Sequence, residues 1–185
     1  GGLKMSDLFG RKNQIPMIIG LSAVNASYDE YSKLDILGYP FKFIQKLNPE
    51  RNSIGKIRQF YPHILYEKRQ NAQLHRYGLG PFCHFTISNE WSGVCGVYAV
   101  CDSQQLLYIG QCIDLAKRYN SGYGNISPRN CFIGGQQTNC KINAMVLKKY
   151  LEGGEVYLYF YETKDFDRVE HKLISRLTPP LNERV

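Results

Sequence analysis

Apolar and polar positions alternate most clearly in the second half of the chain. Residues 94–101 and 106–110 form two short apolar runs around a polar turn, which predicts a β-hairpin. In residues 155–163 valine, leucine and phenylalanine alternate with tyrosines, which predicts a half-buried strand. Helical spacing predicts three helices: residues 113–120, from Thr138 or Asn139 to residue 151, and from Asp167 to residue 177. This order predicts a small α+β unit.

The first half of the chain has a less regular pattern. Residues 28–37 are predicted to be helical and to end at Gly38, and residues 41–47 form a short apolar and basic segment. The pattern changes near residue 90. We therefore expect two domains, a mixed and largely helical extension over residues 1–90 and a compact α+β domain over residues 91–185.

Charge adds a candidate partner to this picture. The 185 residues carry a net charge of +7 with a pI of about 9.1, a balance typical of proteins that bind polyanions, although a basic surface can also serve solubility alone. No apolar run approaches the roughly 20 residues that cross a bilayer, and no signal peptide is recognisable. The sequence therefore predicts a cytoplasmic protein without a membrane partner.

Basic and aromatic residues are interleaved between residues 55 and 77. The cations there that we expect to contact DNA are Lys56, Arg58, Lys68 and Arg69. Cations that track phosphates beside aromatics that stack on bases are typical of a nucleic-acid surface. An ordinary solvated face whose aromatics pack on the core explains the pattern equally well.

Two residues of the second domain suit phosphodiester hydrolysis. Glu170 lies in one helical stripe with Leu173 and Leu177, and a carboxylate on the core side of a helix needs a partner or a cation. A hard ion such as Mg²⁺ fits that requirement, whereas a capping box that begins at Asp167 is the structural alternative. Arg118 could stabilise charge on a phosphate, or it could be an ordinary surface arginine.

Taken in order, five motifs resemble the GIY-YIG nucleases over roughly residues 94–183. They are Gly96-Val97-Tyr98, Tyr108-Ile109-Gly110, Arg118, the glutamate of Val169-Glu170-His171-Lys172-Leu173-Ile174, and Pro179-Pro180-Leu181-Asn182. The resemblance implies an α/β sandwich with a central three-stranded antiparallel sheet flanked by helices. It also implies metal-dependent cleavage of nucleic acid, without an organic cofactor.

The resemblance assigns a role to individual residues. Tyr98 and Tyr108 are the tyrosines of the two motifs, Arg118 is the catalytic arginine, and Asn182 steadies the site. Glu170 is the metal ligand and holds one Mg²⁺ or Mn²⁺ ion per active site.

Two positions depart from the family pattern. Many relatives carry lysine where this chain has Gln111, and Lys117 or Lys141 could replace its charge. Many relatives also have histidine or tyrosine about one turn after the arginine. That position here is Gly122, and Tyr123 one residue later is our candidate for the same catalytic role.

A glycine-containing loop before the second predicted helix is a further candidate for DNA contact. Gln136, Gln137, Asn139 and Lys141 have side chains that read base edges or hold phosphates, and we add Gln111 and Lys117 to this set. The structural alternative for the loop is a glycine turn followed by a capped helix.

These features together predict a restriction-type endonuclease that hydrolyses double-stranded DNA. Cleavage of both strands at a symmetric site favours a homodimer on DNA or a transient pair. A phage or mobile-element endonuclease of low specificity is the nearest alternative. A module that binds nucleic acid without cutting it is the alternative from another class.

Overall fold

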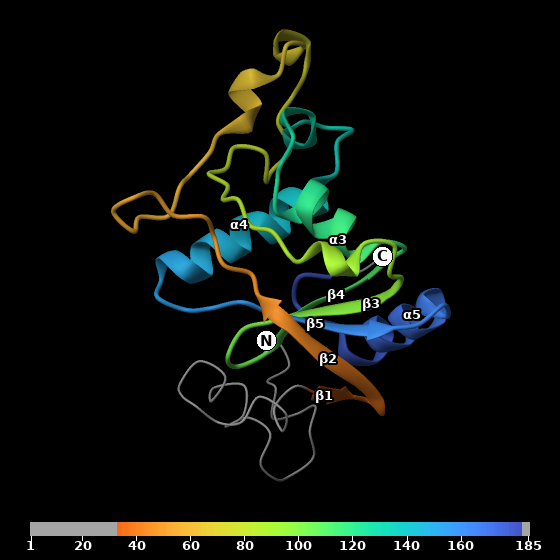
Figure 1. The fold of residues 1–185 in the computed structure, drawn as a ribbon. Helices are drawn as coiled ribbons and strands as arrows, with labels where there is room; N and C mark the ends of the chain where they lie inside the picture. The colour runs from red at the N-terminus through yellow and green to blue at the C-terminus, as the bar shows by residue number, and fades with distance from the viewer. Residues whose placement is uncertain (1–32, 183–185) are drawn as a thin grey trace. The chain divides into compact units, whose positions relative to one another are not determined.

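The computed structural model describes residues 33–182, which form two compact units (Figure 1). The sheet unit comprises residues 33–46, 94–113 and 156–182, and the helical unit comprises residues 47–93 and 114–155. The chain passes back and forth between them. Each unit is therefore built from segments on both sides of the boundary predicted at residue 90.

The sheet unit contains one antiparallel sheet of five strands in the order β1-β2-β5-β3-β4. The strands are β1 (Lys33–Ile36), β2 (Tyr39–Lys46), β3 (Gly96–Cys101), β4 (Leu106–Cys112) and β5 (Tyr157–Glu162). Strands β3, β4 and β5 are the three expected for the second domain. The prediction of a three-stranded sheet is wrong because the first half of the chain adds β1 and β2 beside β5.

Strand β1 lies where a helix was expected; residues 28–32 of that prediction fall outside the described residues. Leu34 and Ile36 are buried while their neighbours are exposed, which is the period of a strand. Leu37 and Gly38 both have positive φ, 50° and 88°, as a tight hairpin turn requires. The alternating burial of residues 33–36 fits a strand better than a helix, and the positive φ angles of Leu37 and Gly38 favour the hairpin over a continuing helix.

Helix α5 (Phe166–Leu177) covers one face of the sheet. Val169, Leu173 and Leu177 project from it into a core that also contains Val97, Ala99 and Ile109 of the central hairpin. Residues Tyr157–Phe160 of β5 are all buried, so the prediction of a half-buried strand is wrong for its central part. Tyr157 and Tyr159 belong to the core that contains α5, and Leu158 and Phe160, which alternate with them, are buried as well, so both faces of this part of the strand are covered.

The helical unit is built around α4 (Gln137–Leu151). Before it come α3 (Leu115–Arg118), a π-helical turn η4 (Tyr119–Tyr123) and a short 3₁₀ helix η5 (Pro128–Cys131). Asp114 caps α3 by accepting a hydrogen bond from the Lys117 backbone N–H at 2.9 Å. Helix α4 ends at residue 151 as predicted, but it begins at Gln137, before the predicted start at Thr138 or Asn139, and it has no side-chain cap.

Residues 47–93 of the helical unit follow an irregular course. They contain three 3₁₀ helices, η1 (Pro62–Leu65), η2 (Arg69–Asn71) and η3 (Asn89–Trp91), and isolated bridges join Phe60 to Phe82 and Leu74 to Phe132. No α-helix occurs between residues 33 and 90, so the expectation of a largely helical extension is wrong for this part. Recurrent glycine and proline explain why long helices do not form here. Across residues 33–182, no helix is long and apolar enough to cross a membrane.

Candidate functional site

Strands β3 and β4 bring the two motif tyrosines together in the sheet unit. Tyr98 is paired with Gly110, and Tyr108 lies two residues earlier on β4, so the tyrosines form a diagonal cross-strand pair. Their ring centroids are 6.2 Å apart, with the ring planes inclined by 33°. Because Val97, Ala99 and Ile109 point toward α5, side-chain alternation directs both tyrosines to the opposite face.

Gly110 has no side chain because the Tyr98 ring occupies that space. A Cβ atom at residue 110 would lie 2.3 Å from both Cζ and Oη of Tyr98. The aromatic end of a tyrosine that is only 1% exposed cannot move away without repacking the core. The glycine of the second motif is thus explained by the position of the first motif's tyrosine.

We therefore expect Gly110→Ala to destabilise the protein by about 1–3 kcal/mol through overpacking. Chemical denaturation followed by circular dichroism measures the effect. Gly122→Ala is the matched control, because a Cβ there meets its nearest atom at an ordinary 3.6 Å. Tyr98→Ala should relieve the clash, so a double variant whose loss equals the sum of the two single losses contradicts this explanation.

The C-terminal segment covers the open edge of β4. Leu181 donates its backbone N–H to the Leu107 carbonyl at 3.0 Å. The Asn182 side chain accepts the Ile109 N–H at 2.9 Å and donates its Nδ2–H to the Ile109 carbonyl at 2.8 Å. Asn182 thus imitates the peptide group of a neighbouring strand and satisfies the edge that carries Tyr108.

Glu170 lies further along the same edge. The Gln111 backbone N–H donates to its carboxylate, two residues beyond the position bound by Asn182. Burial raises the pKa of Glu170, the negative charge of Asp167 raises it further, and the Gln111 amide acts in the opposite direction. The capping-box alternative does not hold, because α5 begins at Phe166 and has no side-chain cap.

Glu170 and Gln111 carry oxygen atoms of the kind that a hard divalent ion binds. Gln111 is paired with Val97, so its side chain belongs to the α5 side of the sheet. Its Oε1 atom is buried and has no hydrogen-bond partner among the described residues. The described chain contains no cluster of three or more His, Cys, Asp or Glu residues that could enclose a metal. Mg²⁺ needs no such cluster, since it retains several waters and takes one or two protein oxygens.

Arg118 is held by three neutral side chains within the helical unit. Its Nη2 donates to Tyr123 Oη at 2.9 Å, and its Nη1 donates to Asn139 Oδ1 at 3.1 Å and to Gln136 Oε1 at 3.4 Å. The guanidinium carbon also lies 4.2 Å from the centre of the Tyr123 ring. This arrangement fixes the orientation of the guanidinium group through three partners that carry no charge of their own.

A π-helical turn explains why Tyr123, and not residue 122, meets Arg118. The Gly124 N–H donates to the Tyr119 carbonyl at 2.7 Å, so the turn is one residue longer than an α-helical turn. Tyr123 therefore lies beneath Arg118 although it is five residues later. The chain therefore turns helically as far as Tyr123, three residues beyond the end predicted at residue 120.

Asn143 of α4 supports this turn and was not identified from the sequence. Its Nδ2 donates to the carbonyls of Tyr123 and Cys83 at 2.7 and 2.8 Å, and its Oδ1 accepts the Cys83 N–H at 2.9 Å. The side chain is fully buried. Its signal in the sequence is the spacing of Asn139 and Asn143, two amides four residues apart in the apolar stripe of a helix.

The residues predicted to contact DNA through α3 and α4 divide into two groups. Gln136 and Asn139 turn toward Arg118, and Asn139 is only 2% exposed. Lys117 and Gln137 are exposed, and Lys141 lies with Nζ 5.8 Å from the centre of the Tyr77 ring. The first group contacts Arg118, and contact with DNA stays a prediction for both groups.

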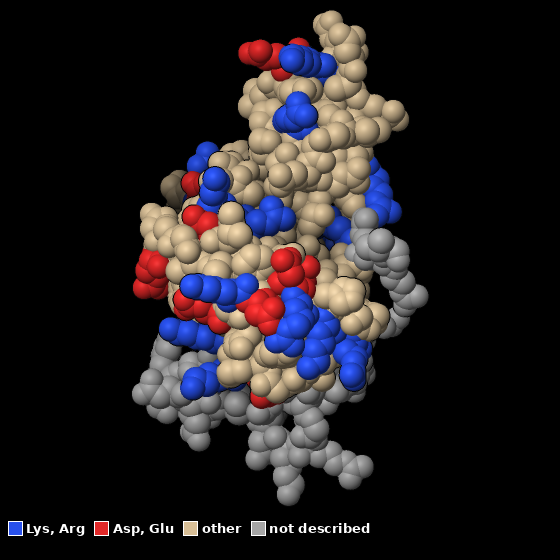
Figure 2. Space-filling model, turned by 90° about the vertical axis from the view of Figure 1, so that its right-hand side faces the viewer, with Lys and Arg blue, Asp and Glu red and all other residues tan. Residues whose placement is uncertain are grey.

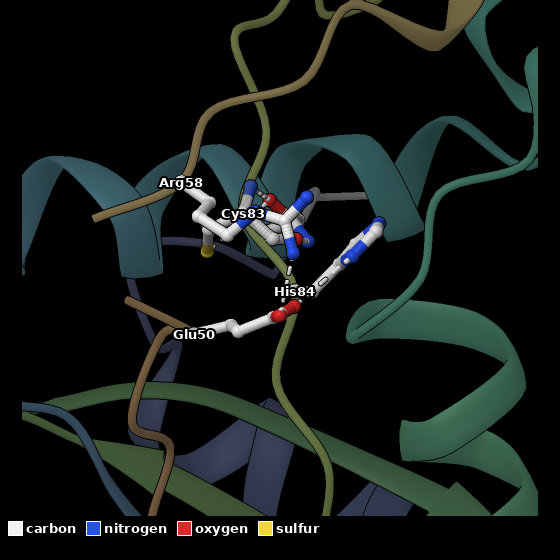
Figure 3. Close-up of polar contacts among 5 residues, drawn as sticks. Glu50, Arg58, Cys83 and His84 are labelled. Atoms are coloured by element: carbon white, nitrogen blue, oxygen red, sulfur yellow. Dashed lines mark hydrogen bonds and ion pairs between the residues drawn. The ribbon is translucent and has the colours of Figure 1, made fainter. Parts of the chain in front are cut away.

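The basic residues predicted in the N-terminal half also have different surroundings. Arg58 forms an ion pair of 2.7 Å with Glu50, which also approaches His84 Nδ1 at 3.6 Å (Figure 3). The His84 ring stacks on Phe60 with centroids 3.8 Å apart. Glu50 partly offsets the charge of Arg58, whereas Lys56, Lys68 and Arg69 are exposed.

No family model matches this sequence, and no curated protein or solved structure shows significant similarity to it.

Proposed function

We propose that this protein is a metal-dependent endodeoxyribonuclease of the GIY-YIG type. The observation that carries the proposal is that the candidate groups lie along a few residues of the edge strand β4, with the tyrosines on one face of the sheet and the Gln111 side chain on the other. Tyr108 lies beside Tyr98 there, Asn182 is bound at Ile109, and Glu170 is bound at Gln111. A strand whose edge is closed by a conformationally restrained asparagine gives these groups a rigid support.

Glu170 and Gln111 are the residues proposed to hold a divalent ion. When bound, such an ion would supply positive charge to the phosphate that is cleaved and to the groups around it. The buried and unsatisfied Gln111 Oε1 gives a reason for a glutamine at this position, since an amide oxygen can serve where many relatives have a lysine. Burial of Glu170 supports the same proposal. A buried carboxylate without a partner destabilises the fold, and a bound cation would compensate its charge.

Tyr98 and Tyr108 are proposed to orient the water that attacks the phosphate. The water oxygen forms a bond to phosphorus, one phosphorus–oxygen ester bond breaks, and the leaving oxygen takes up a proton. Tyr98 accepts the proton of the attacking water as a phenolate. A free phenol has a pKa of about 10, so this role needs nearby positive charge.

Arg118 is proposed to stabilise the negative charge that develops at phosphorus. A guanidinium group with two forked donors matches phosphate oxygens, and a permanent positive charge suits the crowded anionic centre. Tyr123 and Asn139 then act as positioning residues that hold the fork in one orientation. Such preorganisation is the main source of catalysis in phosphoryl transfer.

The proposed substrate is double-stranded DNA, and the proposed class is a restriction-type enzyme that acts as a homodimer on a symmetric site. The net charge of +7 favours a polyanionic substrate. An endonuclease of low specificity is the second candidate within the same chemistry.

Incubation with plasmid and phage DNA, with Mg²⁺ or with EDTA, tests the proposal. We expect cleavage with Mg²⁺ or Mn²⁺ and none with EDTA. Discrete fragments support the restriction-type enzyme, and a smear supports the enzyme of low specificity. A gel shift without cleavage under any metal condition overturns the nuclease and favours a module that only binds.

A further inference from the structure

The 3₁₀ helix η1 presents apolar side chains to solvent at one end of the helical unit. Tyr61, Ile64 and Leu65 are 47%, 54% and 74% exposed, and we call these three residues the apolar tip. Single exposed apolar residues are normal on protein surfaces, but three within five positions of a short helix are a local concentration. The tip takes no part in the site around β4 or in the group around Arg118.

Anchored neighbours limit the directions in which the tip can point. The 3₁₀ helix comprises Pro62–Leu65, so Tyr61 precedes it and Tyr66 follows it. His63 and Tyr66 point inward, since His63 Nδ1 is buried and the Tyr66 ring packs 4.8 Å from that of Phe132. Anchoring of the inward face prevents the tip from turning into the core.

Both ends of the segment are attached to the core of the helical unit. Phe60 exchanges backbone hydrogen bonds of 2.8 and 2.9 Å with Phe82, directly before the tip. Phe82 and Phe132 are almost completely buried in the core that also contains Cys131 and Cys140. The tip is therefore a fixed projection, and it can enter a partner without first being ordered.

Basic residues predominate in the sequence around the tip, although Glu50, just outside this stretch, pairs with Arg58. Residues 51–77 contain one acidic residue, Glu67, against six cations: Arg51, Lys56, Arg58, Lys68, Arg69 and Arg76. Arg69 donates from Nη1 to the Ile64 carbonyl, which holds a cation directly beside the apolar side chains. Arg129 is exposed on η5, which packs against η1. At the top of the view, Figure 2 shows uncharged atoms projecting beside Lys and Arg, with acidic atoms next to these cations.

We propose that the apolar tip is a wedge that inserts between base pairs of duplex DNA while the adjacent cations bind phosphates. Proteins that kink DNA use isoleucine, leucine and proline in this way, with cations on either side. The basic surroundings favour DNA over a second copy of this chain, since two such surfaces repel each other. The inference rests on the proposed function, which makes duplex DNA the substrate, and it adds that this substrate is bound in a deformed state.

Equilibrium binding with EDTA present tests the wedge without cleavage. The probe is a duplex with 2-aminopurine at successive positions, because its fluorescence rises when a base step is unstacked. The double variant Ile64→Ser/Leu65→Ser should bind about tenfold or more weakly than wild type and lose the fluorescence increase. Leu151→Ser, at an exposed residue of α4, is the matched control and should change neither quantity.

The salt dependence separates the wedge from ordinary phosphate binding. Serine at the tip changes no charge, so the slope of log Kd against log salt should stay at its wild-type value. Lys68→Ala/Arg69→Ala should reduce that slope by about 1.8, at roughly 0.9 for each phosphate that the variant no longer neutralises. Leu65→Ser alone should weaken binding and reduce the fluorescence increase to a smaller extent than the double variant. It provides the same test if the double variant misfolds.

Wild-type affinity and fluorescence in the double variant, with cleavage of DNA unchanged, would overturn the wedge and leave the nuclease standing. A wild-type dimer in sedimentation that the double variant loses, with DNA binding unaffected, overturns it in favour of self-association. Wild-type protein that unstacks DNA without cutting it in Mg²⁺ supports the wedge and overturns the nuclease. Affinity and fluorescence that both fall as described, at an unchanged salt slope, support the wedge.

Discussion

Replacing Glu170 with glutamine is expected to abolish DNA cleavage while leaving DNA binding largely intact. The substitution keeps an oxygen that accepts the Gln111 N–H but removes the charge that a divalent ion requires. We expect a fall in the cleavage rate of at least about 10³-fold, in the range of other losses of electrostatic stabilisation. Single-turnover cleavage and a gel shift measure the two quantities. Cleavage at the wild-type rate would show that Glu170 holds no essential ion.

The same substitution should have the opposite effect on stability. The pKa of Glu170 is raised in the folded protein, so the fold binds more protons than the unfolded chain between the ordinary and the raised pKa. The stability of the wild type therefore falls as the pH rises through that interval, and the loss is complete above the raised pKa. With EDTA present, Glu170→Gln should melt at a higher temperature than wild type at neutral pH. The difference should vanish below the ordinary carboxyl pKa of about 4.3.

Divalent ions should stabilise the wild type and not the Gln variant. At a concentration one hundred times its Kd, an ion that binds only the folded state adds about 2.7 kcal/mol. The control is Asp167→Asn, because Asp167 is the second cause of the raised pKa of Glu170 but is not proposed to hold the ion. This control should keep cleavage and move the acid limb of its pH profile to lower pH. An acid limb that stays in place would show that Glu170 does not set it.

The elements that rest on long, regular patterns could be predicted from the sequence. Helices α4 and α5 end where Gly153 and Pro179 follow them, and the hairpin of β3 and β4 has the turn and alternation expected. Strand β2 could not be predicted, because its pairing partner β5 lies more than a hundred residues later. The short amphipathic segment of residues 33–36 acquires its structure from β2, with which it pairs.

The candidate site could likewise be predicted only in part from the sequence. The residue types at Tyr98, Glu170 and Asn182 could be selected from their motifs, but the edge of β4 that joins them is a tertiary feature. Gln136 and Asn139 were predicted to contact DNA, since amides in a glycine-containing loop resemble base-reading residues. Their contact with Arg118 depends on the π-helical turn, and one added residue in a turn leaves no periodic signal in the sequence.

Replacing Arg118 with alanine is expected to lower the cleavage rate by about 10²–10³-fold, with a much smaller effect on DNA binding. Lysine at this position should recover little activity, because an ammonium group cannot reproduce the forked donors that Tyr123, Asn139 and Gln136 orient. Guanidinium ion added to Arg118→Ala should restore part of the rate if the missing group acts on charge at the phosphate. Thermal melting of each variant controls for loss of the fold.

The partners of Arg118 provide the decisive comparison. Asn139→Leu keeps the guanidinium group but removes one of its acceptors, so we expect the maximal rate to fall by about tenfold while the DNA concentration for half-maximal rate changes little. In the double variant Arg118→Ala/Asn139→Leu the second substitution should cost almost nothing, since Asn139 acts only through Arg118. Full additivity of the two losses would show that Asn139 contributes by another route, such as a direct contact with DNA. The cycle thus tests directly whether this buried amide orients the arginine or binds the substrate.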